Sequence, residues 1–283
     1  MRKEKKHIPQ RLDVTRLNEH ALSSSIAGIQ DSLIWRRNNA GQRNSNIMST
    51  IDNSRVFLIT GASTGIGEAT ARRAVEAGWR VALAARSKDR LKALETDLGL
   101  DRAMAVACDV SDWSEQQEMV RKTIERFGRI DAAFANAGFS KGSTFYGGDD
   151  KPDEWRDMVL TNVYGAAVTA RLVLPELVKT RGHFLVTGSV VGRITSIRNL
   201  YSATKWAVTG MAQAIRNEMS GTGIRVTLVE PGIVDTPFWD NLQKPSAAEL
   251  LPDDIARAVI YAVSQPPHVD VNEILIRPTG QQN

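Results

Sequence analysis

The stretch RVFLITGASTGIGEATARRAVEAG, residues 55–78, decides the fold of this chain. An apolar, β-branched run is followed at once by glycines at the spacing G-x-x-x-G-x-G, and then by a sequence with helical periodicity. Gly61 permits a tight turn, Gly65 allows the backbone to approach a ligand closely, and Gly67 allows the helix to pack on the strand. Free N–H groups at the start of such a helix bind phosphate. The stretch therefore predicts a dinucleotide-binding turn that also includes Ser63, Thr64 and Ile66.

Six further apolar runs of this kind follow, and helical stretches separate them. The predicted strands are residues 55–60, 80–85, 103–108, 130–135, 183–188, 224–230 and 273–278. Strands that alternate with helices indicate βαβ units with right-handed crossovers. We expect a single α/β domain with a Rossmann-like, doubly wound fold, in which helices cover both faces of a seven-stranded, mainly parallel sheet. Its ligand crevice should lie at the carboxyl ends of the strands.

The composition fits one globular domain of this kind with an additional N-terminal segment. Of the 283 residues, 42% are hydrophobic and 24% are charged, which excludes a disordered chain. Residues 1–48 hold nine Lys or Arg and four Asp or Glu, whereas the whole chain carries +4, so the remainder is nearly neutral. We predict that residues 1–50 form a basic, disordered arm with at most a short helix at 16–34, or result from a start codon placed upstream of Met48. Residues 51–283 then form the folded domain.

The sequence also argues against several classes of protein. The basic residues of the arm lack regular spacing and aromatic neighbours, so its positive charge does not predict nucleic-acid binding. No apolar run reaches the roughly 18 residues that span a bilayer, and the first 50 residues lack the apolar core of a signal peptide. A single cysteine, Cys108, and the absence of an HExxH pair predict neither a disulfide nor a metal site. We expect a cytoplasmic protein.

The end of the second predicted strand indicates which nicotinamide dinucleotide binds. An enzyme that uses NAD usually has an acidic side chain there for the ribose 2′-hydroxyl, about 20 residues beyond the glycines. This chain has Ala85 followed by Arg86, whose guanidinium can form paired hydrogen bonds with a 2′-phosphate. Lys88 and Arg90 are cationic neighbours. We therefore predict NADP as the cofactor, with Arg86 among its ligands.

A set of motifs spread along the chain identifies the type of domain. The motifs are Thr60-Gly61-x-x-x-Gly65-x-Gly67, Cys108-Asp109-Val110, Asn136-Ala137-Gly138, Asn162, Ser189, Tyr201-x-x-x-Lys205 and Pro231-Gly232. Any one of them is common, but the complete set in this order is specific, and with it residues 54–280 resemble the short-chain dehydrogenase/reductase family. The resemblance implies an oxidoreductase that interconverts a secondary alcohol and a ketone by hydride transfer with NADP(H).

The predicted catalytic residues are Asn162, Ser189, Tyr201 and Lys205. Tyr201 and Lys205 are four positions apart, so the phenol and the ammonium lie on one helical face and can act together. A free tyrosine has a pKa of about 10, and a nearby ammonium favours the phenolate that a general base requires. In the reductive direction Tyr201 donates a proton to the carbonyl oxygen, which the Ser189 hydroxyl holds. The resemblance implies that Asn162 helps to hold a water that links Lys205 to solvent.

The resemblance also implies cofactor contacts beyond the glycine turn. Asp109, with Val110, is expected at the adenine, and the loop Asn136-Ala137-Gly138 is expected to let the backbone approach a cofactor ribose. The nicotinamide carboxamide is expected to meet the segment after the sixth strand, which contains Pro231, Gly232, Val234 and Thr236. Tyr201 and Lys205 complete the predicted cofactor site. The segment 237–250 is a short candidate lid, which argues against bulky substrates.

Two chemical classes of substrate fit the sequence. Arg193 and Arg198 lie between Ser189 and Tyr201, where either can clamp a carboxylate. The C-terminal sequence resembles family members that oxidise small 3-hydroxy acids such as serine, and we expect a substrate of this class. The alternative is a hydrophobic ketone, because four aromatic residues in the bordering loops offer apolar walls. These are Phe139, Tyr146, Phe238 and Trp239.

Other functions fit the sequence less well than a reductase or dehydrogenase. A sugar epimerase or dehydratase on a related fold needs a longer region after the sixth strand. A cofactor-binding regulatory protein without turnover is a further alternative, although Ser189, Tyr201 and Lys205 are all retained. The resemblance implies a homotetramer or homodimer built partly on the helices that follow Pro152 and Tyr201. We expect a small carbonyl or alcohol substrate and neither a nucleic-acid nor a membrane partner.

Overall fold

The computed structural model describes residues 55–141, 145–147, 151–194, 199–240, 242 and 249–281. The predicted N-terminal arm at 1–50, with its helix at 16–34, lies outside the described residues, and so does half of the candidate lid at 237–250, namely 241 and 243–248. Arg55 is the first described residue of the predicted domain.

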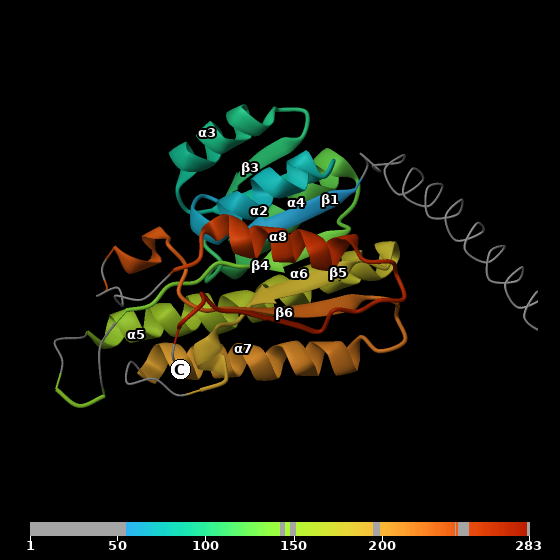
Figure 1. The fold of residues 1–283 in the computed structure, drawn as a ribbon. Helices are drawn as coiled ribbons and strands as arrows, with labels where there is room; N and C mark the ends of the chain where they lie inside the picture. The colour runs from blue at the N-terminus through green and yellow to red at the C-terminus, as the bar shows by residue number, and fades with distance from the viewer. Residues whose placement is uncertain are drawn as a thin grey trace, which may run out of the picture. The chain divides into compact units, whose positions relative to one another are not determined.

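Seven parallel strands form one sheet, which confirms the predicted fold (Figure 1). The strands are β1 (Val56–Thr60), β2 (Arg80–Ala85), β3 (Ala103–Ala107), β4 (Ala132–Ala135), β5 (His183–Thr187), β6 (Arg225–Pro231) and β7 (Glu273–Ile276). Their order in the sheet is β3-β2-β1-β4-β5-β6-β7, and every neighbouring pair is parallel. Each predicted strand is found within two residues of its expected ends, and the sheet is parallel throughout rather than mainly.

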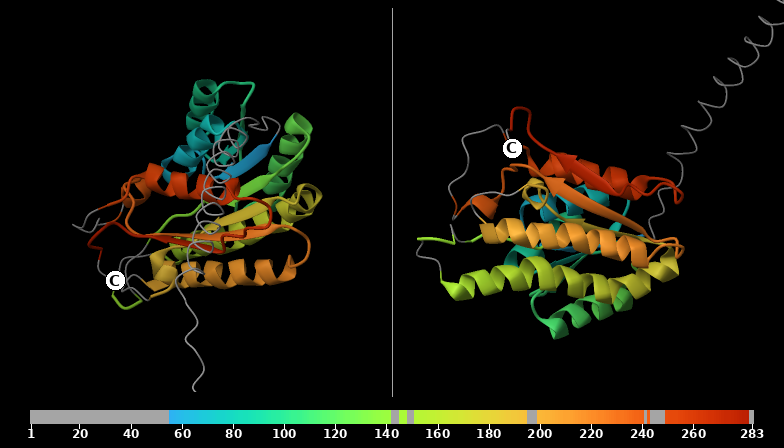
Figure 2. Two further views of the ribbon diagram at one scale, coloured as in Figure 1. Left: turned by 45° about the vertical axis from the view of Figure 1, so that its right-hand side comes forward. Right: turned by 90° about the horizontal axis from the view of Figure 1, so that it is seen from below.

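Helices cover both faces of the sheet. Residues of α2 (Gly65–Glu76), α3 (Lys88–Leu98) and α8 (Pro252–Ser264) belong to one apolar core, on the side that faces the viewer in Figure 1. Residues of α4 (Trp113–Phe127), α6 (Ala166–Thr180) and α7 (Asn199–Glu218) belong to the other core. Figure 2 shows α7, α6 and α4 side by side on this second face. The short helix α5 (Pro152–Val159) precedes α6.

Alternating side chains of the buried strands build these two cores. In β1, Val56 and Leu58 pack on the side of α4, α6 and α7, whereas Phe57 and Ile59 pack on the side of α2 and α8. All four are completely buried. A strand that is covered on both faces needs apolar residues at every position, which is why β1 reads as an unbroken apolar run rather than an alternating one.

One helical stretch, Pro152–Thr180, is long and apolar enough by length and composition to cross a membrane. It consists of α5, a π-helical turn η1 (Leu160–Gly165) and α6. Val173 and Leu177 of α6 are completely buried in the core beside the sheet. The core helix of a globular domain passes the same test, so packing against the sheet accounts for the apolar side of this stretch.

The order of the strands fixes where a ligand can bind. The chain leaves β1 toward β2 and β3, and then returns to build β4 to β7 on the other side of β1. The loops that follow β1 and β4 therefore lead in opposite directions and leave a crevice at the carboxyl edge of the sheet.

Candidate active site

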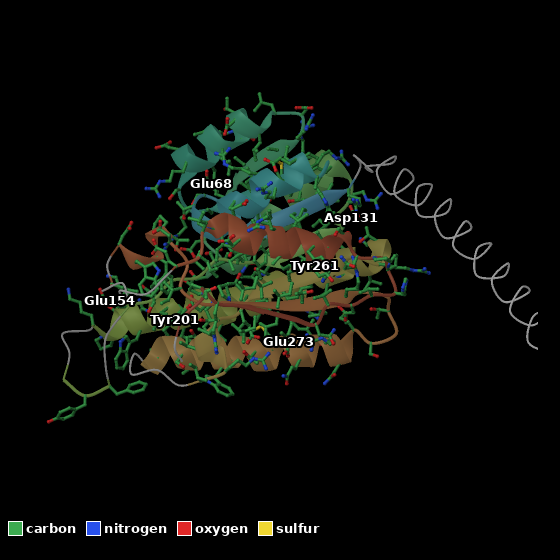
Figure 3. The ribbon with its side chains drawn as sticks, in the orientation of Figure 1. Glu68, Asp131, Glu154, Tyr201, Tyr261 and Glu273 are labelled. Atoms are coloured by element: carbon green, nitrogen blue, oxygen red, sulfur yellow. The ribbon has the colours of Figure 1, made fainter. Side chains whose placement is uncertain are left out.

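A cavity of about 1360 Å³ lies at the carboxyl edge of the sheet. The loops that follow β1 to β6 line it, and so do all of the predicted catalytic and cofactor residues except Gly67 and Asn162. In Figure 3, Tyr201 marks this edge of the sheet, and Asp131, which precedes β4, marks the opposite edge. Residues far apart in the sequence thus meet at a single site.

The glycine turn after β1 has the backbone that a pyrophosphate requires. Gly61 and Gly65 have positive φ angles of 64° and 57°, which L side chains rarely adopt. A Cβ at Gly67 would lie 2.2 Å from the Gly61 carbonyl oxygen, so α2 packs on the turn only because position 67 is glycine. Thr64, the N-cap of α2, makes no capping bond with its side chain, which leaves the first N–H groups of the helix open to the cavity. These residues fit a dinucleotide phosphate.

Asn136 connects the ends of three strands next to this turn. Its backbone N–H and that of Ala137 both donate to Thr60 Oγ1, at 3.0 and 3.1 Å. Its side-chain Nδ2 donates to the Thr60 carbonyl at 3.1 Å, and its Oδ1 accepts from Thr187 Oγ1 at 3.0 Å. The loop Asn136-Ala137-Gly138 is therefore tied to β1 and β5. Thr187, the last residue of β5, was not among the predicted site residues, although a polar residue at a buried strand end is a signal for it.

Arg86 and Asp109 lie at the ends of β2 and β3, where an adenosine end is expected. The Arg86 guanidinium is 70% exposed and its Nη1 lies 3.9 Å from Asp109 Oδ2, so it makes only a long contact with this carboxylate. Burial would raise the pKa of Asp109, but hydrogen bonds from Ser111 and the charge of Arg86 outweigh burial and lower it. Arg86 is thus a largely exposed cation that lines the cavity next to Ala85.

Ser189, Tyr201 and Lys205 meet at the opposite end of the cavity. The Ser189 side chain lies close enough to the Tyr201 hydroxyl to act on its pKa, and Lys205 Nζ lies 5.6 Å from the centre of the Tyr201 ring. Lys205 is 3% exposed and donates to the Thr187 carbonyl at 2.8 Å. Burial raises the pKa of Tyr201, and the Ser189 side chain only partly offsets this effect. Burial also lowers the pKa of Lys205, to about 8.

Asn162 lies in the π-helical turn η1 behind these residues. Its Oδ1 accepts from the Phe139 N–H at 3.0 Å, and its Nδ2 donates to the Phe139 carbonyl at 2.9 Å and to Thr204 Oγ1 at 3.1 Å. The side chain therefore holds the backbone just beyond Gly138 against α7. A Cβ at Gly138 would lie 3.1 Å from Asn162 Oδ1 and 3.6 Å from Lys205 Nζ, so this loop passes close to both. Its predicted part in a water path to Lys205 stays a prediction.

Thr236 brings the segment after β6 against the glycine turn. A Cβ at Gly65 would lie 3.0 Å from Thr236 Cγ2, so the segment after β6 packs directly on the glycine turn here. Val234 pairs with Leu250 in a short parallel bridge, and its carbonyl accepts from Trp239 Nε1 at 2.9 Å. These bonds hold the segment at the wall of the cavity.

Aromatic side chains form the wall next to Tyr201. The Phe238 ring lies 5.4 Å from the Tyr201 ring and 5.2 Å from the Trp239 ring, between ring centres. Phe139 lines the same cavity, with Val190, Val191, Ile194 and Leu242. Tyr146 does not line it and is 94% exposed, so its predicted role as a wall is wrong.

Arg193 does not serve as a carboxylate clamp, which corrects the prediction for this residue. Its Nε and Nη2 donate to the two carboxylate oxygens of Glu230 at 2.6 and 2.8 Å, and Nη2 also lies 2.6 Å from Glu273 Oε2. Glu230 is 1% exposed, so the guanidinium neutralises a buried carboxylate and is not available to a substrate. Arg198, the other predicted clamp, lies outside the described residues.

The fold and the site together define a nicotinamide-dependent oxidoreductase of the Rossmann type. Residues 55–247 match the family model described as short chain dehydrogenase, and the chain belongs to the short-chain dehydrogenase/reductase family. The protein is therefore an oxidoreductase that acts on a CH–OH group with NAD or NADP as the acceptor. Among the residues that the structure describes, no group of three or more His, Cys, Asp or Glu is placed to hold a metal ion.

Three comparisons give the degree of similarity. An uncharacterized oxidoreductase of Staphylococcus aureus (strain MRSA252) is 37% identical over 231 residues, which are 81% of this chain and 99% of that protein. The alcohol dehydrogenase of the archaeon Thermococcus sibiricus, complexed with 5-hydroxy-NADP, is 34% identical with a TM-score of 0.74, over 81% of this chain and 98% of that one. The closed form of a serine dehydrogenase complexed with NADP+ is 30% identical with a TM-score of 0.76, over 81% and 96%.

Burial of Lys205 predicts a pH dependence of stability. The pKa of Lys205 is about 8 in the folded protein against 10.5 ordinarily, so the unfolded chain binds more protons between these values. The free energy of unfolding therefore rises with pH above about 8, until near pH 10 the raised pKa of Tyr201 begins to oppose it. Lys205→Met lacks this amine and should not gain stability with it. We therefore expect the Tm of Lys205→Met minus the Tm of wild type to decrease steadily between pH 8 and 10 in protein without cofactor.

Lys122 provides the control, because its side chain is 48% exposed whereas Lys205 is 3% exposed. Lys122→Met should keep a constant Tm difference from wild type over the same range. Parallel Tm curves for Lys205→Met and wild type would show that the buried amine does not titrate in this window.

Proposed function

We propose that this chain is an NADP(H)-dependent carbonyl reductase for small hydrophobic ketones, which also oxidises the corresponding secondary alcohols. The observation that carries the proposal is the meeting of the Tyr201 and Ser189 side chains in one cavity, with Lys205 Nζ 5.6 Å and the Phe238 ring 5.4 Å from the Tyr201 ring. This pair presents two hydroxyl groups to one substrate oxygen, beside an apolar wall.

The four residues divide the proton chemistry among them. When bound, the nicotinamide supplies a hydride to the carbonyl carbon or accepts one from the alcohol. Tyr201 donates its proton to the carbonyl oxygen, and its raised pKa keeps the phenol protonated at neutral pH. The Ser189 hydroxyl holds the same oxygen, and the Lys205 ammonium stabilises the phenolate that remains. Asn162 acts through the Phe139 backbone and through Thr204, which it fixes next to Lys205.

The choice of NADP over NAD rests on the end of β2. Ala85 offers no acceptor for a 2′-hydroxyl, whereas Arg86 is 70% exposed and only loosely paired with Asp109. Its planar guanidinium can take a 2′-phosphate with two parallel hydrogen bonds. Arg90 and Ser87 line the cavity on the same side. The two related structures complexed with 5-hydroxy-NADP and NADP+ support this choice.

The substrate class rests on the lining beside Tyr201. Seven of the described lining residues are apolar side chains from the loops around Tyr201, and Ser140, Thr161 and Ser189 are polar lining residues of the same cavity. The apolar residues are Phe139, Val190, Val191, Ile194, Phe238, Trp239 and Leu242. Arg193 is bound by Glu230 and Glu273 and gives no charge to the cavity. A neutral aryl or alkyl group fits this wall better than a carboxylate, because an anion would be desolvated there. Lys205, the described cation beside Tyr201, already donates to the Thr187 carbonyl.

A second candidate is oxidation of a small 3-hydroxy acid. The similarity to a serine dehydrogenase over 81% of this chain favours it, and Arg198 is the remaining candidate clamp in the sequence. A regulatory protein without turnover is the weaker alternative, since Ser189, Tyr201 and Lys205 are brought together around one cavity.

We also propose that copies of the chain associate through the second face of the sheet, as a homotetramer or a homodimer. Several large apolar side chains on α5, η1, α6 and α7 are exposed in the single chain: Val159, Tyr164, Val178 and Trp206. Such a face gains stability when a second apolar face covers it. A cytoplasmic location, and an arm at 1–50 that is dispensable for the domain from 51 to 283, complete the proposal.

Replacement of Tyr201 tests the reaction. Tyr201→Phe removes the proton donor but keeps the ring against Phe238, so turnover should fall by about 100-fold or more while NADPH affinity stays within a few-fold. Steady-state rates and a fluorescence titration of NADPH measure the two effects. Retention of more than about a tenth of wild-type activity would remove Tyr201 from the proton-donor role.

Exchange of two residues at the end of β2 tests the cofactor. The wild type should prefer NADP(H), and Ala85→Asp with Arg86→Ile should reduce kcat/KM for NADPH by about ten- to 100-fold, the range expected for a lost charged hydrogen bond of roughly 1.5–3 kcal/mol. Arg102→Ile, at an exposed arginine before β3, is the control and should leave kcat/KM for NADPH and for NADH unchanged. Equal kcat/KM for NADPH and NADH in the wild type would contradict the assignment.

A matched pair of substrates tests the substrate class. We expect kcat/KM for the methyl ester of a 3-oxo acid to exceed that for the free acid by at least about tenfold, because the acid must lose hydration beside an apolar wall. Phe238→Ala should remove most of this preference, and Tyr146→Ala, at an exposed aromatic residue outside the cavity, should not. A free acid that reacts as fast as its ester, or faster, would favour the hydroxy-acid candidate instead.

A further inference from the structure

The last described residues of the chain return to the segment that follows β6. After β7 the backbone turns at Gly280, whose φ is +89°, and the Gln281 N–H donates to the Pro278 carbonyl at 3.1 Å. The Gln281 side chain then reaches back, and its Oε1 accepts from the backbone N–H of Ile233 at 3.0 Å. Residues 48 positions apart are joined, and both line the cavity of the candidate active site.

Gly232 shows how closely Gln281 packs here. A Cβ at position 232 would lie 2.2 Å from Gln281 Oε1 and 3.1 Å from Pro278 Cδ. The amide oxygen of Gln281 therefore occupies the space that a side chain at 232 would need. Glycine at 232 and glutamine at 281 fit as a pair, which is an observation independent of the hydrogen bond itself.

The hydrogen bonds of the segment leave one N–H group available. Gly232 N–H donates to the Ile276 carbonyl at 2.7 Å, and Asp235 N–H donates to the Leu250 carbonyl at 2.8 Å. The Gln281 side-chain oxygen accepts a hydrogen bond from the N–H of Ile233, a residue that is 8% exposed. Within the described part of the chain, only the Val234 N–H of residues 232–235 has no acceptor, and Val234 lines the cavity. The segment thus presents a single N–H donor to a ligand.

We infer that Gln281 is a positioning residue for the nicotinamide end of the dinucleotide. Its side-chain oxygen fixes the Gly232–Ile233 peptide plane, and the Leu250 N–H holds the carbonyl of the next peptide, Ile233–Val234, at 2.8 Å. Together the two bonds set the direction of the Val234 N–H toward the carboxamide. Without that acceptor the buried Ile233 N–H has no partner, and the segment must rotate or admit water to satisfy it. The inference rests on the proposed function, because it requires that a nicotinamide dinucleotide occupy this cavity.

Two substitutions at position 281 separate the bond from the bulk of the side chain. Gln281→Met keeps the length but removes the acceptor, whereas Gln281→Glu keeps an oxygen for the Ile233 N–H. Binding is measured by titration with NADPH and with 2′,5′-ADP, a fragment that lacks the nicotinamide. For Gln281→Met we expect NADPH to bind about tenfold more weakly, the change that 1.4 kcal/mol produces, with 2′,5′-ADP unchanged. Gln281→Glu should restore NADPH binding to within about threefold of wild type.

Gln265 provides a matched control at a remote site. Its side chain donates to the Tyr261 carbonyl at the end of α8 and does not line the cavity, so Gln265→Met should bind both ligands as the wild type does. If Gln281→Met binds NADPH as tightly as wild type, or loses NADPH and 2′,5′-ADP equally, the inference is overturned while the proposed function stands. A wild-type protein that binds neither NADPH nor NADH would overturn both.

Discussion

Asn136 bonds to the carboxyl ends of two strands, and the rest of the site depends on the spacing that it sets. Through Thr60 it fixes the end of β1, where the glycine turn begins, and through Thr187 it fixes the end of β5, which leads to Ser189. The Thr187 carbonyl in turn accepts from Lys205 Nζ. One amide side chain, with both its oxygen and its nitrogen bonded, thus relates the glycine turn to Ser189 and Lys205, two of the residues proposed for proton transfer.

Burial acts on the proton-transfer pair in a way that suits a neutral substrate. The same desolvation raises the pKa of Tyr201 and lowers that of Lys205, because it disfavours the charged form of each. The neighbouring wall of Phe238 and Trp239 adds apolar surface but no charge. A carbonyl group that enters such a site meets two neutral hydroxyl donors, whose interaction with it is strengthened by the exclusion of water.

Arg193 shows how a charged residue near a site can serve the fold instead. In sequence it stands four positions after Ser189, where an arginine suggests a ligand for an anion. Its guanidinium forms a forked pair with Glu230 at the end of β6 and also meets Glu273 at the start of β7. A buried carboxylate without such a partner would be strongly destabilising, so the arginine is required by Glu230. This pair joins the turn that carries Ser189 to the strand that leads into Gly232 and Val234.

The sequence by itself determined the seven strands and the glycine turn, because these depend on periodicity and on the backbone demands of a tight turn, which are local properties. Ser189, Tyr201 and Lys205 were identified from the resemblance to the family, together with the spacing of four that puts Tyr201 and Lys205 on one helical face. Only the tertiary structure decided which distant residues individual side chains bond to. The pairing of Arg193 with Glu230 spans 37 positions, and that of Gln281 with Ile233 spans 48. Neither pairing leaves a local pattern, since a hydrogen bond needs only that two atoms be brought together, and it is the packing of the whole sheet that brings them there.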